Sequence, residues 1–99
     1  MGYELKLHTG FYRTTHVDLS LFRDGLLLRP LTDGPDEPLL IPAREIRSIA
    51  FVRNSHSQIH IQTDSRLISG TFTKDTDLRS VFHSFRQQIV ARMTYEESN

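Results

Sequence analysis

Apolar and polar residues alternate along most of the first 73 residues of the chain. Tyr3, Leu5 and Leu7, for example, are separated by charged residues. A period of two predicts antiparallel strands that bury one face and expose the other. The predicted strands cover residues 3–9, 14–23, 26–32, 38–42, 46–53, 57–63 and 66–73.

One hairpin is marked by Asp24-Gly25, a pair that favours a two-residue turn. Pairing about this turn places Arg23 opposite Leu26 and Ser20 opposite Arg29. Asp18 then lies diagonal to Arg29, which predicts an ion pair. The face expected to be buried carries only apolar residues, namely Val17, Leu19, Leu21, Leu26 and Leu28.

The stretch LLIPAREIRSIAF, residues 39–51, contains a proline between two apolar runs. Pro42 has no amide hydrogen, so a strand in the middle of a sheet cannot continue through it. The sequence therefore predicts that one strand ends at residue 41, that residues 43–45 form a corner, and that the next strand begins at Ile46.

The spacing of apolar residues changes to three and four after residue 75, which predicts an amphipathic helix over residues 76–93. Asp75 or Thr76 is the expected N-cap. Asp77 would lie in the first turn and Arg92 in the last. Residues 95–99 are expected to be a solvated tail. The apolar face expected to close the rolled sheet consists of Leu78, Phe82, Phe85 and Ile89.

Length and composition favour one small cytoplasmic domain, residues 1–94. The chain has 99 residues, and its twelve basic and twelve acidic residues give a net charge of zero, so no global charge attracts nucleic acid. It has no cysteine, which excludes disulfides and a thiol nucleophile. No apolar run is long enough to span a membrane, and the N-terminal residues lack the apolar core of a signal peptide.

The chain resembles the pleckstrin-homology-like (PH-like) superfold, and within it the GRAM and bacterial PH-like families. The resemblance rests on Ile41-Pro42 followed by Glu45-Ile46 and Ile49, on the pair Ile59 and Ile61, and on Phe72 before the helix. It implies a mainly β fold in which seven antiparallel strands form a barrel or sandwich capped by one C-terminal helix. The helix lacks the tryptophan that is usual in PH domains.

No residue cluster predicts a metal, a cofactor or a catalytic centre. His56 and His60 are four residues apart on a strand, about 13 Å, which is too far for one zinc ion. His8 and His16 lack a third ligand. The acids of the loop at 33–37 lack the spacing of a calcium site. Because no nucleophile, phosphate-loop or dinucleotide motif is present, we expect no enzymatic activity.

Three apolar residues of the hairpin, Phe22, Leu27 and Leu31, are predicted to lie beside Arg29 on the outer face. Either another segment of the chain covers them, or they form a docking patch for a protein partner or a second copy. Arg79 and Arg86 lie on the polar face of the predicted helix, either as a solvated face or as a site for an acidic partner.

These observations predict a non-catalytic interaction module that mediates protein–protein contacts or self-assembly. By resemblance to the superfold, a peptide groove is expected between residues 46–53 and the helix. The alternative is a cytoplasmic adaptor that binds acidic phospholipid headgroups at a membrane surface through Lys6, Arg13 and Arg23. Lys6 and Arg13 match two positions of the phosphoinositide-binding motif of PH domains, but Thr15 occupies the third.

Overall fold

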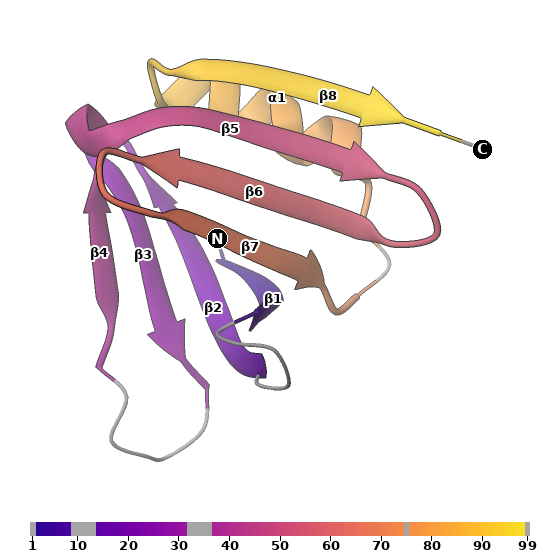
Figure 1. Cartoon of the computed structure of the whole chain (residues 1–99), viewed down its shortest axis with the longest axis horizontal. Helices are drawn as coiled ribbons and strands as arrows, with labels where there is room; N and C mark the ends of the chain where they lie inside the picture. The colour runs from indigo at the N-terminus through magenta and orange to yellow at the C-terminus, as the bar shows by residue number, and fades with distance from the viewer. Residues whose placement is uncertain (1, 9–13, 32–36, 75, 99) are drawn as a thin grey trace.

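A computed structural model describes residues 2–8, 14–31, 37–74 and 76–98 of the chain. In these residues one sheet of eight strands is bent around a single α-helix (Figure 1). The elements are β1 (Gly2–His8), β2 (Thr14–Phe22), β3 (Gly25–Pro30), β4 (Leu39–Pro42), the 3₁₀ turn η1 (Ala43–Glu45), β5 (Ile46–Arg53), β6 (Ser57–Thr63), β7 (Leu67–Phe72), α1 (Leu78–Gln88) and β8 (Arg92–Glu97).

The strands follow the order β4-β3-β2-β1-β7-β6-β5-β8, so β1 and β7 join the two halves of the sheet. All neighbours are antiparallel except β5 and β8. The inner faces of both halves meet in one apolar core, as the alternation predicts. Its fully buried members from the strands include Leu5, Leu19, Leu26, Ile49, Phe51, Ile59 and Ile61.

The β2–β3 hairpin has a different register from the predicted one. Phe22 pairs with Gly25, and Asp18 lies directly opposite Arg29 rather than diagonal to it. The predicted inner face is nevertheless correct, because a shift of two residues leaves every side chain on its own side of the sheet. Gly25 has a φ of 153°, and a Cβ there would meet the Ile41 carbonyl oxygen, so this position requires glycine.

The corner at Pro42 is confirmed. Pro42 ends β4, Ala43–Glu45 form a single 3₁₀ turn, and β5 begins at Ile46. The corner is fixed at both ends by backbone hydrogen bonds. The Ala43 amide donates to the Asp24 carbonyl at 2.8 Å, and the Asp64 amide donates to the Glu45 carbonyl at 3.1 Å.

Helix α1 begins later than predicted, because Asp77 is its N-cap and accepts hydrogen bonds from Ser80. The Thr76 hydroxyl donates instead to the Lys74 carbonyl. Asp75 lies outside the described residues, as do Arg13 and most of the predicted loop at 33–37. The helix buries Leu78, Val81 and Phe85 against the sheet, and Ile89 is buried directly after it.

The C-terminal part of the helix prediction is wrong. The helix ends at Gln88, because Ile89 already has extended backbone angles, φ −123° and ψ 132°. Arg92–Glu97 then form β8, which pairs in parallel with β5. The described residues thus contain eight strands rather than seven, Arg92 is not helical, and the predicted tail from residue 95 begins inside a strand. The predicted domain end at residue 94 also falls within β8.

The helix closes the sheet chiefly through Phe85, which is 0 % exposed. We expect Phe85→Ala to lower the free energy of unfolding by about 3–5 kcal/mol, because it removes a buried ring and leaves a cavity. Phe22→Ala is the matched control. Phe22 is 50 % exposed, so its loss should cost about 1 kcal/mol or less. Urea unfolding followed by circular dichroism measures both, and equal losses would contradict the packing described above.

Candidate interaction surfaces

An apolar patch lies on the outer face of β2, β3 and β4. Leu27 of β3 pairs directly with Leu40 of β4, and it pairs on its other side with Ser20, two residues from Phe22. Phe22 is 50 % exposed and Leu40 63 % exposed, while Leu27 is half-buried. We call Phe22, Leu27 and Leu40 the outer apolar patch. No described segment covers it, so among the described residues the docking interpretation is favoured.

Leu31 does not belong to this patch, although the sequence grouped it with Phe22 and Leu27. Its amide donates to the His16 carbonyl at 3.0 Å, which places it beyond Arg29 along β3. The Arg29 guanidinium lies 3.7 Å from the Asp18 carboxylate, and this ion pair separates Leu31 from Leu27. The predicted pairing of Asp18 with Arg29 is therefore confirmed, and it forms the border of the patch.

Leu40 is the member of the patch that the sequence reasoning missed. The strand over 38–42 was predicted. Which of its side chains face outward, however, depends on how the strand pairs with β3. The neighbouring Ile41 could have revealed it, because Ile41 is buried and alternation then places Leu40 outside.

The free edge of β4 is poorly suited to pairing with another strand. β4 is only four residues long, Pro38 precedes it and Pro42 ends it. Short edge strands that carry proline resist the addition of a further strand, because proline offers no amide hydrogen. The outer apolar patch is thus available to a partner through its side chains rather than through sheet extension.

Arg79 of α1 lies next to β8 rather than on a free helix face, whereas Arg86 is exposed on the helix. The Arg79 guanidinium lies 5.7 Å from the centre of the Tyr95 ring and 3.2 Å from the Glu97 carboxylate. Hydrogen bonding to Tyr95 and then to Glu97 raises the pKa of Arg79 above its ordinary value, so it stays charged. Arg86 lies 5.6 Å from the centre of the Phe82 ring.

The predicted peptide groove between residues 46–53 and the helix is filled. β8 lies along β5 over six paired positions, from Ser48–Arg92 to Arg53–Glu97, and α1 lies beside both strands (Figure 1). The Ser98 amide extends the contact by donating to the Arg53 carbonyl at 2.8 Å. In this structure the chain itself supplies the strand that the resemblance led us to expect from a partner.

Two residues of the lipid alternative, Lys6 and Arg23, are not brought together. Lys6 pairs with His16 on the outer face, whereas Arg23 lies in the turn at the far end of β2, and Arg13 is outside the described residues. Lys6 instead shares a hollow of about 540 Å³ with residues from β1, β2, β6, β7 and the turns beside them. The hollow is lined by Lys6, His8, His16, His56, Gln58, Thr71, Phe72 and Thr73.

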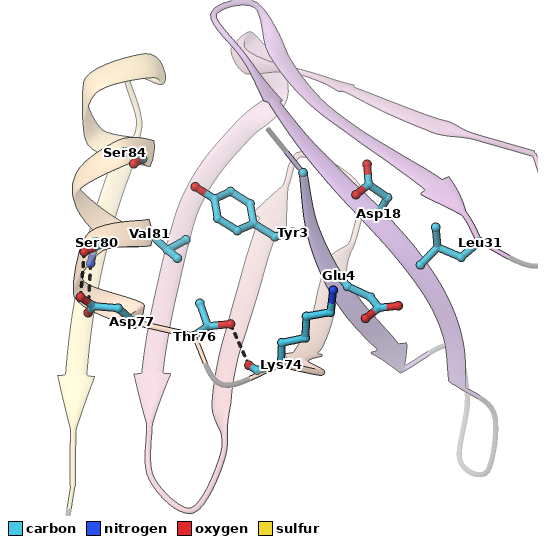
Figure 2. Close-up of a pocket in the computed structure, with 11 residues that line it drawn as sticks. Tyr3, Glu4, Asp18, Leu31, Lys74, Thr76, Asp77, Ser80, Val81 and Ser84 are labelled. Atoms are coloured by element: carbon cyan, nitrogen blue, oxygen red, sulfur yellow. Dashed lines mark hydrogen bonds between the residues drawn. The ribbon is translucent and has the colours of Figure 1, made fainter.

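A second hollow of about 570 Å³ lies between the first turns of α1 and the start of β1 (Figure 2). Several of its polar groups are hydrogen-bonded within the protein. The Glu4 carboxylate accepts a hydrogen bond of 2.7 Å from the Thr73 hydroxyl, and Asp77 accepts one of 2.8 Å from the Ser80 hydroxyl. The hydrogen bonds from Ser80 lower the pKa of Asp77. The carboxylates of Glu4 and Asp77 in this hollow therefore serve a contact between strands and the cap of the helix.

The described part of the chain also bears on metal binding and on membrane-spanning helices. No three histidine, aspartate or glutamate side chains there lie close enough to share a metal ion. No helix in those segments has the length and apolar character needed to cross a membrane.

Comparison with known proteins shows the fold. One chain of a solved structure, described as the "Structure of the Spt16D Pob3N heterodimer", superposes with a TM-score of 0.71 at 13% sequence identity. The alignment covers 100% of this chain and 55% of that one, so this chain spans about half the length of the matched chain. No protein-family model matches the sequence, and no curated protein is similar to it. The protein has a mainly β, PH-like fold, with one α-helix among its described residues, near the C-terminus.

The capping of α1 by Asp77 generates a pH-dependent prediction. Because folding lowers the pKa of Asp77, the stability that its carboxylate contributes is complete above the unfolded-state value, about 3.9, and is lost as the pH falls through the folded value. We expect Asp77→Ala to lower the melting temperature by a few degrees at pH 7, and by much less at pH 3.

Thermal unfolding followed by circular dichroism at pH 7, 5 and 3 measures this difference. Asp24→Ala is the matched control, because Asp24 lies in an exposed turn where only its backbone makes a hydrogen bond. A loss for Asp77→Ala that is equally large at pH 3 and pH 7 would contradict the capping role.

Proposed function

We propose that the protein is a non-catalytic interaction module that binds other protein chains, in the first instance a second copy of itself, through the outer apolar patch. The observation that carries this proposal is the exposure of Phe22 and Leu40 beside Leu27 on a face that the described residues leave uncovered. Exposed clusters of large apolar side chains on small domains mark contact surfaces, because burying them against a partner removes them from water.

Charge favours association between copies. The chain has no net charge, so two copies do not repel each other. Arg29 and Asp18 lie side by side at the border of the patch. In a two-fold arrangement, in which each copy presents the same surface, the Arg29 of one copy can face the Asp18 of the other. The GRAM or bacterial PH-like type, suggested by Ile41-Pro42 and Ile59/Ile61, is also part of this proposal.

Leu40→Asp tests the patch, because it places a charge at its most exposed member. We expect the wild-type chain to form a dimer or larger assembly at tens of micromolar, and we expect Leu40→Asp to shift the mass to that of a monomer. Multi-angle light scattering over a concentration series measures the mass.

Leu67→Asp is the matched control for this substitution. Leu67 is 58 % exposed, against 63 % for Leu40, but it lies on β7 in the other half of the sheet. Its variant should keep the wild-type mass. A monomeric wild-type chain throughout the series, or equal dissociation by both variants, would overturn self-association through the patch.

A second candidate function is supported by the hollow around Lys6. Lys6, His8, His16 and His56 contribute basic side chains to it, and none of the described residues that line it is acidic. An acidic phospholipid headgroup is the ligand that this charge would attract. In this alternative the protein is an adaptor at a membrane surface, with Lys6 as its principal contact.

Co-sedimentation with vesicles containing phosphatidylserine tests the alternative. We expect binding at low salt that is lost at 0.5 M salt, because exposed charges are screened over about 8–10 Å at physiological ionic strength and over less at higher salt. Lys6→Glu should abolish binding, whereas Arg44→Glu, an exposed cation in η1, should preserve it. Binding that persists at high salt, or is lost equally in both variants, would remove the Lys6 hollow as the lipid site.

A further inference from the structure

We propose that the protein binds a free α-amino acid with an apolar side chain in a cavity between the two halves of the bent sheet. The cavity has a volume of about 330 Å³, and we call it the inner cavity. It is lined by Leu7, Thr15, Val17, Leu28, Pro30, Glu37, Leu39 and Arg66. None of the described residues that line the Lys6 hollow lines the inner cavity.

The inner cavity lies at the end of the core that is away from α1. Phe85 of the helix packs against Tyr3, with 6.1 Å between the ring centres. Leu7 lies four residues further along β1, about 13 Å from Tyr3. Leu28 pairs with Leu39 at this end, on the face opposite to the outer apolar patch, because their neighbours Leu27 and Leu40 point outward. The cavity is therefore separate from the surface proposed for self-association.

Burial of the lining residues defines a floor, walls and a rim. Val17 and Leu28 are buried and form the floor. The half-buried side chains of the walls are Leu7, Thr15, Pro30 and Leu39. The exposed rim consists of Glu37 and Arg66. An apolar interior with a small number of polar groups at its mouth is typical of a site for a small molecule.

The backbone of Arg66 is held firmly at the rim. Its amide donates a hydrogen bond of 3.1 Å to the Thr63 hydroxyl oxygen, and its carbonyl accepts bonds of 2.9 Å from the Thr63 amide and 3.2 Å from the Gln62 side chain. Thr63 is itself buried, so the turn between β6 and β7 is anchored in the core. This turn brings a cation from one half of the sheet to a cavity whose apolar walls belong to the other half.

The second charge at the rim, Glu37, also lies on a constrained backbone. It precedes Pro38, and a residue before proline is restricted to extended conformations. Neither Glu37 nor Arg66 forms an ion pair with another described residue. A ligand that enters the cavity therefore meets one anion and one cation beside an apolar interior.

A zwitterion with an apolar side chain complements all three features. Its carboxylate can pair with Arg66 through two hydrogen bonds, and its ammonium group can pair with Glu37. Its side chain then replaces water over the floor formed by Val17 and Leu28. A simple fatty acid would instead place its carboxylate beside Glu37, and a simple amine would place its charge beside Arg66, so the rim disfavours both.

The volume of the cavity limits the size of the ligand. A cavity of 330 Å³ equals the volume of about ten water molecules in the liquid. This space suits a single amino acid rather than a peptide. L-leucine and L-phenylalanine are the probes, because each joins one apolar side chain to both charges.

The test is a titration of the ¹⁵N-labelled full chain with L-leucine, followed by the backbone amide signals in NMR spectra. We expect saturable shifts that are centred on Leu7, Val17 and Leu39, with a dissociation constant in the high-micromolar to millimolar range. Glycine carries both charges without an apolar side chain, and it should cause no saturable shifts.

The two rim charges are tested with ligands that each lack one charge. Isocaproate is leucine without its ammonium group, and isoamylamine is leucine without its carboxylate. Both should bind the wild-type chain more weakly than leucine. Arg66→Gln should weaken leucine about fivefold and should not weaken isoamylamine. Glu37→Gln should weaken leucine to a similar extent and should not weaken isocaproate.

Matched controls are provided by exposed residues of the same charge away from the cavity. Arg44→Gln in η1 and Glu96→Gln in β8 should keep the wild-type affinity for leucine. Thr15→Phe fills the cavity while both charges stay in place, and phenylalanine is favourable in a strand, so this variant should lose leucine binding. The amide spectrum of each variant reports whether it is folded. If Thr15→Phe does not fold, the rim variants still decide, because they alter only exposed side chains.

A wild-type chain that shows no saturable shifts with either leucine or phenylalanine overturns the proposal. Equal losses for Arg66→Gln and Arg44→Gln overturn the assignment of the rim. Isocaproate that binds as tightly as leucine overturns the choice of an amino acid in favour of an apolar carboxylate, and glycyl-leucine that binds as tightly overturns it in favour of a peptide C-terminus. These results are independent of the mass measured for Leu40→Asp, which concerns the other face of the sheet.

Discussion

The burial of Phe85 is the interaction on which the rest of this structure depends. The centre of its ring lies 6.1 Å from that of Tyr3 on β1 and 5.2 Å from that of Phe51 on β5, so one helical side chain joins the two halves of the bent sheet. A sheet with one apolar face must cover that face, and α1 covers it here. The outer face of the sheet is then the face that α1 leaves open.

The sequence predicted those features of the fold that local chemistry determines. Pro42 marks the corner correctly, because the loss of its amide hydrogen excludes a central strand whatever the tertiary structure is. Alternation identified the buried face of β2 and β3, yet it gave the wrong register, because a period of two is unchanged by a two-residue shift. The turn was predicted at Asp24-Gly25, whereas in the structure Gly25 is already paired with Phe22. The backbone angle of Gly25 became known only with the structure.

The features that the sequence missed depend on contacts between distant segments. Met93 follows Ile89 by four residues, as in a helix, but the edge of β5 provides a parallel partner that no local pattern reveals. Leu40 joined the outer apolar patch through its pairing with Leu27. Leu31 was excluded from it because Asp18 lies opposite Arg29. Which outer residues form one surface therefore depends on the register between strands.

The two ends of the sheet, β4 at one and β5 with β8 at the other, differ in how their backbone groups are paired. β4 is short and bounded by prolines, so its edge is poorly suited to a further strand. The edge of β5 carries a full set of backbone partners and would invite pairing if it were exposed. β8 covers that edge with few buried contacts of its own. β8 thus protects the edge of β5 by pairing with it, whereas β4 protects its own edge through its short length and its prolines.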